Sequence, residues 1–365
     1  MVLLPEPLAS IERAALLFDQ PSPLHPLPSL TRHVHATTSS RAQIWAKRED
    51  CSSGLGLGGN KIRKLEYVVP SALAGGCDTL ISTGGTQSNH MRQVAAVGNH
   101  LGLKTVLVPQ GSSSSSSFQS PSEAKAFDHA GNVQVNSILG AEYYHAEPNT
   151  PLEHVAEVIK EKGGEPYIIA SGASAHLHGG LGFARWAFEV VEQEEALGVF
   201  FDTIVVPVAS GGTIGGMIAG FKLADRLREE KRVNGSSEVQ QPRTRAIIGI
   251  DTYNKPAGVL EATILEIAKR TAGLIGIGQD AVQPHDVVLD TRFNAGTHTA
   301  CNEHSARGVK LLGTKEGIVS DPIYSGRAMG AILHMAELGE LDENHHVMFV
   351  HTGGVAALGA FPDMR

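Results

Sequence analysis

The sequence predicts an α/β protein built on open, mostly parallel sheets with helices on both faces. Short apolar segments rich in β-branched residues alternate with segments whose apolar residues recur at helical spacing, which is typical of strand–helix–strand units. The expected strands are almost wholly apolar, as strands covered on both faces are. With 365 residues, 42% of them hydrophobic, the chain is long enough for more than one core.

Five segments carry the strand prediction, and they are residues 79–82, 105–108, 203–208, 246–250 and 347–350. Helices are expected after Lys61, around Met91 and through Met217 and Phe221, where apolar residues repeat every three or four positions. Two polar stretches, 111–122 with six consecutive serines and 233–243, are expected to be surface insertions, the first of them flexible.

The composition excludes several classes of function. The formal net charge is −8 and no basic run is present, which argues against a nucleic-acid partner. No apolar run is long enough to cross a membrane, and residues 1–19 lack a signal-peptide pattern. The three cysteines are scattered without a Cys-x-x-Cys pair, so we expect free thiols in a reducing, cytoplasmic compartment.

The histidines do not predict a metal site. The pairs His176/His178 and His345/His346 could suggest ligands, but no carboxylate or cysteine spacing supports them. We therefore expect no metal.

A glycine-rich loop leads into the first expected helix and ends at a lysine. Four glycines between Gly54 and Gly59 let the backbone approach a ligand closely, and Lys61 follows at the helix start, where anions are favoured. A lysine that is desolvated or set beside another cation, here Lys64, loses basicity and can attack an aldehyde. Taken alone, the loop favours a solvated surface lysine, as most lysines are.

Two further loops place polar groups after expected strands, where open parallel sheets bind ligands. Residues Gln87, Ser88, Asn89 and His90 follow the 79–82 strand, although Ser88 and Asn89 could simply cap the next helix. After the 203–208 strand, Ser210-Gly211-Gly212-Thr213 can present backbone N–H groups to a phosphate. A dinucleotide fingerprint would need glycine where Thr213 stands.

A reactive lysine, a phosphate loop and polar strand ends together suggest pyridoxal phosphate, whose aldehyde and phosphate they match. The chain resembles the pyridoxal-phosphate family of 1-aminocyclopropane-1-carboxylate deaminases and D-cysteine desulfhydrases, of the tryptophan-synthase-β fold type. The motifs that carry the resemblance are Trp45 to Asp50, Gly58 to Tyr67, Gln87-Ser88-Asn89, Gly179 to Phe183 and Thr352-Gly353-Gly354.

The resemblance implies two open, mostly parallel twisted sheets in two domains. The larger, cofactor-binding domain would comprise 1–63 and 176–365, and a small α/β domain would comprise 64–175 with the insertion 111–122. It also implies a homodimer with a small amino-acid substrate.

The resemblance assigns roles to residues as well. Lys61 would bind the cofactor covalently, and Ser88 and Tyr324 would complete the catalytic set. The other cofactor-binding residues would be Asn60, Lys64, Asn89, Ser210, Gly211, Gly212, Thr213 and Ser325. The substrate would contact Gln87, Ser88, His90 and Thr352.

Four differences, at three positions and in one loop, favour the desulfhydrases over the deaminases. Where deaminases have glutamate, leucine and glutamine, this chain has Ser325, Thr352 and His90, and its Ser210–Thr213 loop also resembles the desulfhydrases. We therefore expect elimination of sulfide from D-cysteine, giving pyruvate and ammonia. Deamination of the cyclopropane amino acid to 2-oxobutyrate and ammonia is the alternative, and a non-catalytic cofactor carrier is a third.

Overall fold

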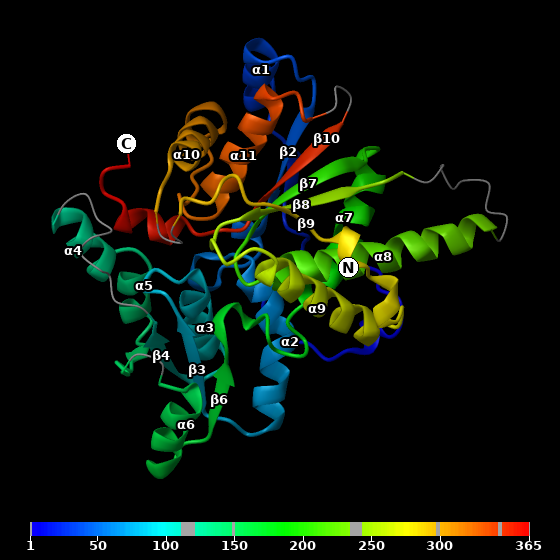
Figure 1. Ribbon diagram of the computed structural model, residues 1–365. Coiled ribbons are helices and arrows are strands. Elements are labelled where there is room, and N and C mark those ends of the chain that lie inside the picture. Colours follow the sequence, from blue (N-terminus) through cyan, green and yellow to red (C-terminus); the bar gives the residue numbers. More distant parts are fainter. Residues whose placement is uncertain are drawn as a thin grey trace. The chain divides into compact units, whose positions relative to one another are not determined.

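The structure, a computed structural model, describes residues 2–110, 121–147, 150–233, 243–296, 300–341 and 345–364. Its helices and strands confirm the α/β prediction (Figure 1). All five predicted strands are present, each extended by one or two residues at one or both ends. The segments 111–120 and 234–242, which make up most of the two predicted insertions, lie outside the described residues.

The chain divides into two compact units. The first comprises residues 1–11, 19–48 and 180–352, and the second comprises 12–18, 49–179 and 353–365. These boundaries differ from the predicted ones, because 12–18, 49–63, 176–179 and 353–365 belong with the second unit. The predicted boundary after Arg63 falls inside the helix Lys61–Ala74. The buried Arg63, in the first turn of this helix, pairs with Glu49 at 2.5 Å.

A six-stranded sheet forms the centre of the first unit, in the order β1-β2-β10-β7-β8-β9. Every described pairing is parallel except β1 with β2. The strands are β1 Leu24–Pro26, β2 Gln43–Arg48, β7 Phe201–Val208, β8 Ala246–Asp251, β9 Val288–Asp290 and β10 His346–His351.

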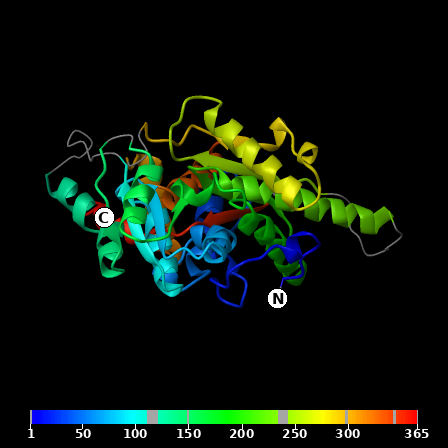
Figure 2. The same ribbon diagram turned by 90° about the horizontal axis from the view of Figure 1, so that it is seen from below.

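Helices cover both faces of this sheet (Figure 1). One layer, whose apolar residues share a core with β2, β7 and β10, consists of α1 Pro28–Thr37, α10 Glu303–Glu316 and α11 Ser325–Glu337. The other layer consists of α7 Leu181–Leu197, α8 Gly212–Val233 and α9 Val259–Leu274. Helices α8 and α9 run side by side in both views (Figure 1, Figure 2).

A four-stranded parallel sheet, in the order β5-β4-β3-β6, forms the centre of the second unit. Its strands are β3 Thr79–Gly84, β4 Lys104–Pro109, β5 Glu142–Tyr143 and β6 Pro166–Ile169. Its helices are α2 Lys61–Ala74, α3 Asn89–His100, α4 Pro121–His129, α5 Asn132–Ile138 and α6 Leu152–Glu161. Leu80 packs with α2 and α3, whereas its neighbour Ile81 packs with α6, because successive strand residues face opposite sides.

Single 3₁₀ turns connect several of these elements in the described chain. They are Leu8–Ser10, Glu49–Cys51, Leu55–Leu57, Ser171–Ala173, Gln279–Ala281, Pro284–Asp286 and Val355–Ala360. Among the described residues, no helix is both long and apolar enough to cross a bilayer. Nor do those residues contain three or more histidine, cysteine, aspartate or glutamate side chains grouped to hold a metal ion.

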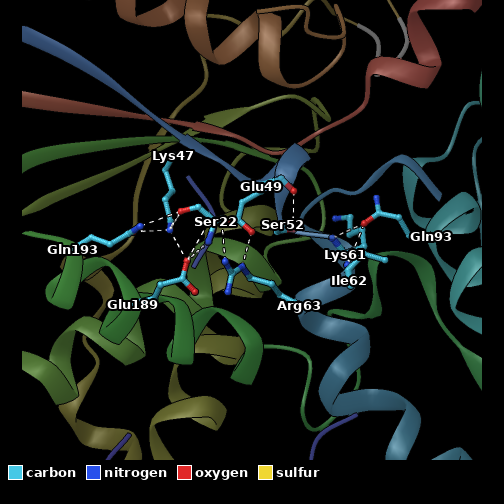
Figure 3. Close-up of polar contacts among 10 residues, drawn as sticks. All are labelled: Ser22, Lys47, Glu49, Ser52, Lys61, Ile62, Arg63, Gln93, Glu189 and Gln193. Carbon is cyan, nitrogen blue, oxygen red and sulfur yellow. Dashed lines mark hydrogen bonds and ion pairs between the residues drawn. The ribbon is translucent and has the colours of Figure 1, made fainter. Parts of the chain in front are cut away.

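Strand β2 was not predicted, because its second half reads as polar. Lys47 is nevertheless fully buried, and its amine donates to the Ser22 carbonyl at 2.8 Å and to Gln193 at 2.7 Å (Figure 3). The same amine forms an ion pair with Glu189 of α7. A buried charge needs such a partner, and the partner is supplied from 142 residues away in sequence.

The polar loops singled out in the sequence follow strands of both sheets. The Gln87–His90 loop follows β3 in the second unit, whereas the Ser210–Thr213 loop follows β7 in the first. The strand before each loop thus belongs to a different sheet.

Candidate active site

Lys61 is the first residue of α2, in the second unit. The glycines before it are required by the backbone: Gly58 and Gly59 have φ of +66° and +120°, and a Cβ on Gly58 would lie 2.3 Å from the Asp50 carbonyl. The side-chain oxygen of Gln93 accepts the N–H groups of Lys61 and Ile62 at 2.9 and 3.1 Å (Figure 3). The helix start that carries Lys61 is thus fixed by a residue of α3.

The amine of Lys61 is less basic than an ordinary lysine. Burial lowers its pKa to about 8, while a hydrogen bond with Lys64 works in the opposite direction. Lys64 is fully buried, and burial and the charge of Lys61 hold its pKa well below the usual value. Its amine donates to the Gly172 carbonyl at 3.1 Å and the Ser174 hydroxyl at 3.2 Å. Lys61, which stays partly exposed, therefore has a nucleophilic neutral fraction near neutral pH.

Ser88 is the N-cap of α3, as expected for a capping residue: its hydroxyl oxygen accepts the Met91 N–H at 3.2 Å. Its own hydroxyl proton can still be donated to a ligand. Asn89 accepts a hydrogen bond from Asn132 at 2.8 Å. Asn60 lies buried at the N-cap of α2.

His90 is 3% exposed, and neither ring nitrogen has a hydrogen-bond partner of normal geometry among the described residues. Burial, followed by the charges of Lys61 and Lys64, holds its pKa well below the usual value. The imidazole is therefore neutral at physiological pH. A buried polar ring in this state can bind a ligand at low desolvation cost.

Gln87 does not offer its side chain to a ligand in the way the sequence suggested. Its amide nitrogen donates to the carbonyls of Phe127 and Ala130 at 2.5 and 3.0 Å, and its oxygen accepts the Asn132 N–H at 2.9 Å. The side chain is buried and holds the start of α5. Contact of Gln87 with the substrate stays a prediction.

In the first unit, Ser210 and Gly211 lead into α8, which begins at Gly212. Gly211 has φ of +85°, and its carbonyl accepts the Gly215 N–H at 2.9 Å. The 22 residues of α8 give its N-terminus the positive dipole end that attracts phosphate. Thr213 adds a hydroxyl to the first turn.

The end of β10 and the start of α11 bring the remaining predicted residues together, also in the first unit. Ser325 is fully buried and its hydroxyl lies 3.2 Å from that of Thr352. Tyr324, beside Ser325, is partly exposed. Burial and the nearby negative charge of Asp321 raise the pKa of Tyr324 well above the usual value, so the phenol is protonated throughout the physiological range.

Sequence reasoning assigned no role to Gln93 or Asp321, although both hold the predicted residues in place. Asp321 accepts the N–H groups of Tyr324 and Ser325 at 2.7 and 3.1 Å. The Asp-Pro pair before a helical pattern is a known helix-start signal and could have identified Asp321. No sequence signal links Gln93 to Lys61, because the contact joins two helices.

Each of these sets, taken by itself, suits one reactive part of pyridoxal phosphate. The second unit provides an amine of lowered basicity at Lys61 for the aldehyde. The first provides a glycine-opened helix N-terminus for the phosphate, and a Cβ on Gly211 would already press on Ile264 at 3.2 Å.

Comparison with known proteins agrees with this fit. The model of the pyridoxal-phosphate dependent enzyme family matches residues 16–353. The chain belongs to this family. It is a pyridoxal-phosphate dependent enzyme, and pyridoxal phosphate is its cofactor.

Two relatives narrow the assignment. A protein of Pseudomonas syringae pathovar syringae and one of Variovorax paradoxus, both named 1-aminocyclopropane-1-carboxylate deaminase, are each 39% identical over 360 residues, 97% of either chain. This confirms the family that the motifs predicted.

Solved structures agree with the fold. A structure titled as an ACC deaminase homologue is 30% identical, with a TM-score of 0.77, and the match covers 98% of this chain and 96% of the other. A cysteine synthase of Entamoeba histolytica, 16% identical with a TM-score of 0.60 over 99% and 91% of the chains, has the same fold. The two-sheet prediction is therefore confirmed.

Proposed function

We propose that the protein eliminates sulfide from D-cysteine, with water and the substrate converted to pyruvate, ammonia and hydrogen sulfide. The observation that carries this proposal is the buried pair of hydroxyls, Ser325 and Thr352, 3.2 Å apart. The family resemblance assigns Ser325 to the pyridine nitrogen of the cofactor and Thr352 to the substrate pocket.

A serine at position 325 changes what the protein can do for the cofactor. A carboxylate there would hold a proton on the pyridine nitrogen, whereas a hydroxyl forms only a neutral hydrogen bond. Loss of a thiolate from Cβ needs a weaker electron sink than opening of an unactivated cyclopropane ring. Thr352 adds a second hydroxyl to the pocket. An apolar residue at this position would better suit the methylene carbons of the cyclopropane ring.

The other residues have roles that follow from their state in the structure. When bound, pyridoxal phosphate supplies the aldehyde that captures the substrate amine and the ring that withdraws electrons from Cα. The amine of Lys61, with its lowered pKa, accepts the Cα proton. Ser88 orients the substrate from the N-terminus of α3, and neutral His90 adds a hydrogen bond. The protonated Tyr324 donates a hydrogen bond to the departing thiolate.

Asn60, Lys64 and Asn89 complete the cofactor-binding set that we propose, with Ser210, Gly211, Gly212 and Thr213 at its phosphate. We also propose that the protein is cytoplasmic and forms a homodimer. Light scattering would show the dimer as a particle of twice the chain mass of 38.6 kDa.

The second candidate function is deamination of 1-aminocyclopropane-1-carboxylate to 2-oxobutyrate and ammonia. It is favoured by the name shared by the relatives that are 39% identical to the chain. It is opposed by Ser325 and Thr352.

Steady-state rates on D-cysteine, L-cysteine, D-serine and the cyclopropane amino acid test the proposal, with sulfide, pyruvate and 2-oxobutyrate measured under one condition. We expect kcat/KM for D-cysteine to exceed that for the cyclopropane substrate by about a hundredfold or more. Equal or reversed values would establish the deaminase instead. A protein that binds the cofactor but turns over none of these would be a carrier.

The double variant Ser325→Glu/Thr352→Leu tests the observation that carries the proposal. We expect sulfide release to fall and 2-oxobutyrate formation to rise, because the glutamate holds the ring proton and the leucine gives the methylene carbons an apolar wall. Each single variant is the control. Ser325→Glu alone should mainly slow elimination, since it leaves the pocket unchanged. If the double variant keeps the wild-type preference, these two residues do not set specificity.

A further inference from the structure

Asp321 accepts hydrogen bonds from the backbone N–H groups at the start of α11. Its Oδ1 accepts the N–H of Ile323 at 2.9 Å and of Tyr324 at 2.7 Å, and its Oδ2 accepts that of Ser325 at 3.1 Å. Its own carbonyl accepts the Gly326 N–H at 2.8 Å. Pro322 has no N–H, so one aspartate satisfies every donor from 322 to 326.

This arrangement is more than an ordinary helix cap. A cap usually accepts one or two of the free N–H groups in the first turn, and Tyr324, at the N-cap position itself, accepts none with its side chain. Asp321 is also fully buried, so its carboxylate has exchanged solvent for these backbone donors. A charge in that position is costly unless its hydrogen bonds hold a particular geometry.

We propose that Asp321 is a positioning residue: its carboxylate fixes the backbone of Tyr324 and Ser325, and thereby aims their side chains for the reaction. The inference rests on the proposed function for the roles of Tyr324 and Ser325. It adds a residue to which neither the sequence motifs nor the relatives assign a role.

The charge of Asp321 has a second effect on Tyr324. Besides burial, this negative charge raises the pKa of the phenol, Tyr253 acts in the same direction and Arg327 opposes them. Burial raises the pKa of Asp321 itself above the usual value, and the three backbone donors and His351 oppose that rise. In its charged form the carboxylate favours the protonated phenol of Tyr324, which can donate a hydrogen bond.

Asp321→Asn in the full-length holoenzyme tests the proposal. The amide retains an oxygen for Ile323 and Tyr324 but places an NH₂ group against the Ser325 N–H. We expect hydrogen exchange at Tyr324 and Ser325 to rise about tenfold or more. We expect kcat to fall about tenfold or more and KM to stay within about threefold, because ground-state binding is retained. Unchanged exchange or unchanged kcat would overturn the proposal.

The matched control is Asp286→Asn, the same change at another aspartate of the first unit that accepts a backbone N–H, that of Gln283 at 2.7 Å. It should leave kcat unchanged. If it lowers kcat as much as Asp321→Asn does, the effect is general and the proposal fails.

A double-mutant cycle with Tyr324→Phe separates positioning from stability. If Asp321 acts through Tyr324, Asp321→Asn should lower kcat by less than about threefold when Tyr324 is already replaced by Phe. A cost equal to that in the wild-type background would overturn the proposal. Should Asp321→Asn not be recovered folded, Asp321→Glu keeps the charge but displaces the carboxylate, and the same cycle and exchange measurements apply.

Failure of the proposed function is distinguishable from failure of this inference. If the wild type prefers the cyclopropane substrate, the substrate assignment is wrong. The exchange measurement and the cycle, run on that substrate, still decide the role of Asp321.

Discussion

The amine of Lys61 is prepared for covalent capture by groups of the second unit. Two glycines with positive φ bring it to the start of α2, and Gln93 fixes the two N–H groups there. Burial lowers its pKa to about 8, over two units below the ordinary value of 10.5. The neutral amine, which attacks the aldehyde, is therefore far more abundant at physiological pH than for an exposed lysine.

The pH dependence of cofactor capture follows from this pKa. The protonated amine is unreactive, so the rate at which apoenzyme takes up pyridoxal phosphate should rise with pH and level off above the pKa of Lys61, about 8. Stopped-flow absorbance measures the rate, and borohydride reduction should place the adduct on the peptide that contains Lys61. Lys104→Ala, at an exposed lysine of the same unit, is the control. A rate that keeps rising to pH 10 would show an unperturbed amine.

Gly212 should be sensitive to negative charge, because it starts the helix to which we assign the phosphate. Gly212→Asp is expected to weaken cofactor binding by about tenfold or more, since the carboxylate repels the phosphate and occupies the same dipole end. Gly212→Asn is the control for size, because the asparagine side chain has the shape of aspartate without its charge. Cofactor titration of the apoproteins measures both. Equal weakening by Asp and Asn would mean that bulk, not charge, is responsible.

The sequence predicted these residues because local backbone demands are visible in it. A run of glycines before a lysine, or serine and asparagine before a helical repeat, has a physical reason at that position. The contacts of Gln87, Gln93 and Lys47 could not be predicted in the same way. Each is satisfied by a partner at least 25 residues away, and only the folded chain brings them together.

At the scale of elements, close helix packing depends on glycine. Helices α7 and α8 approach so closely that a Cβ on Gly220 would lie 2.5 Å from the Ala184 carbonyl and 2.7 Å from its Cα. A Cβ on Gly216 would lie 2.1 Å from the Gly180 carbonyl. Five strands (β3, β4, β7, β8 and β10) and three helices (α2, α3 and α8) were predicted from sequence patterns, but these patterns do not reveal which glycines lie at such crossings.

Gly220→Ala should therefore destabilise the protein, although alanine is the better helix former. Backbone atoms cannot yield as a flexible side chain can, so we expect a loss of about 1–3 kcal/mol in the free energy of unfolding. Gly313→Ala in α10 is the matched control, because its nearest atom would be 4.0 Å away. That change should be neutral or stabilising, by up to about 1 kcal/mol. Chemical denaturation compares the two, and a neutral Gly220→Ala would contradict the packing described.

At the scale of the whole molecule, each unit has its own sheet and its own apolar core. The class of fold could be predicted because apolar strands alternate with helices along nearly the whole chain. The exact division could not, since the second unit combines 12–18, 49–179 and 353–365, segments that only contacts in the folded chain bring together. As a result, the residues proposed to hold the cofactor occur in both units.

This distribution predicts how the cofactor affects stability across the molecule. A ligand that binds only the folded state suppresses opening of the elements that hold it. Removing pyridoxal phosphate should therefore raise hydrogen exchange at the starts of both α2 and α8. Helices α1 and α6, which carry none of the proposed cofactor-binding residues, should change little and serve as internal controls.

Two variants separate the contributions of the units. Lys61→Ala should remove the covalent link and most of the protection at α2, whereas Gly212→Asp should act first at α8. Exchange followed by mass spectrometry on holo and apo forms of each variant gives the comparison. If cofactor removal affects only one of the two helix starts, the residues assigned in the other unit do not bind the cofactor. A uniform increase over all helices, α1 and α6 included, would instead show that the cofactor stabilises the fold globally.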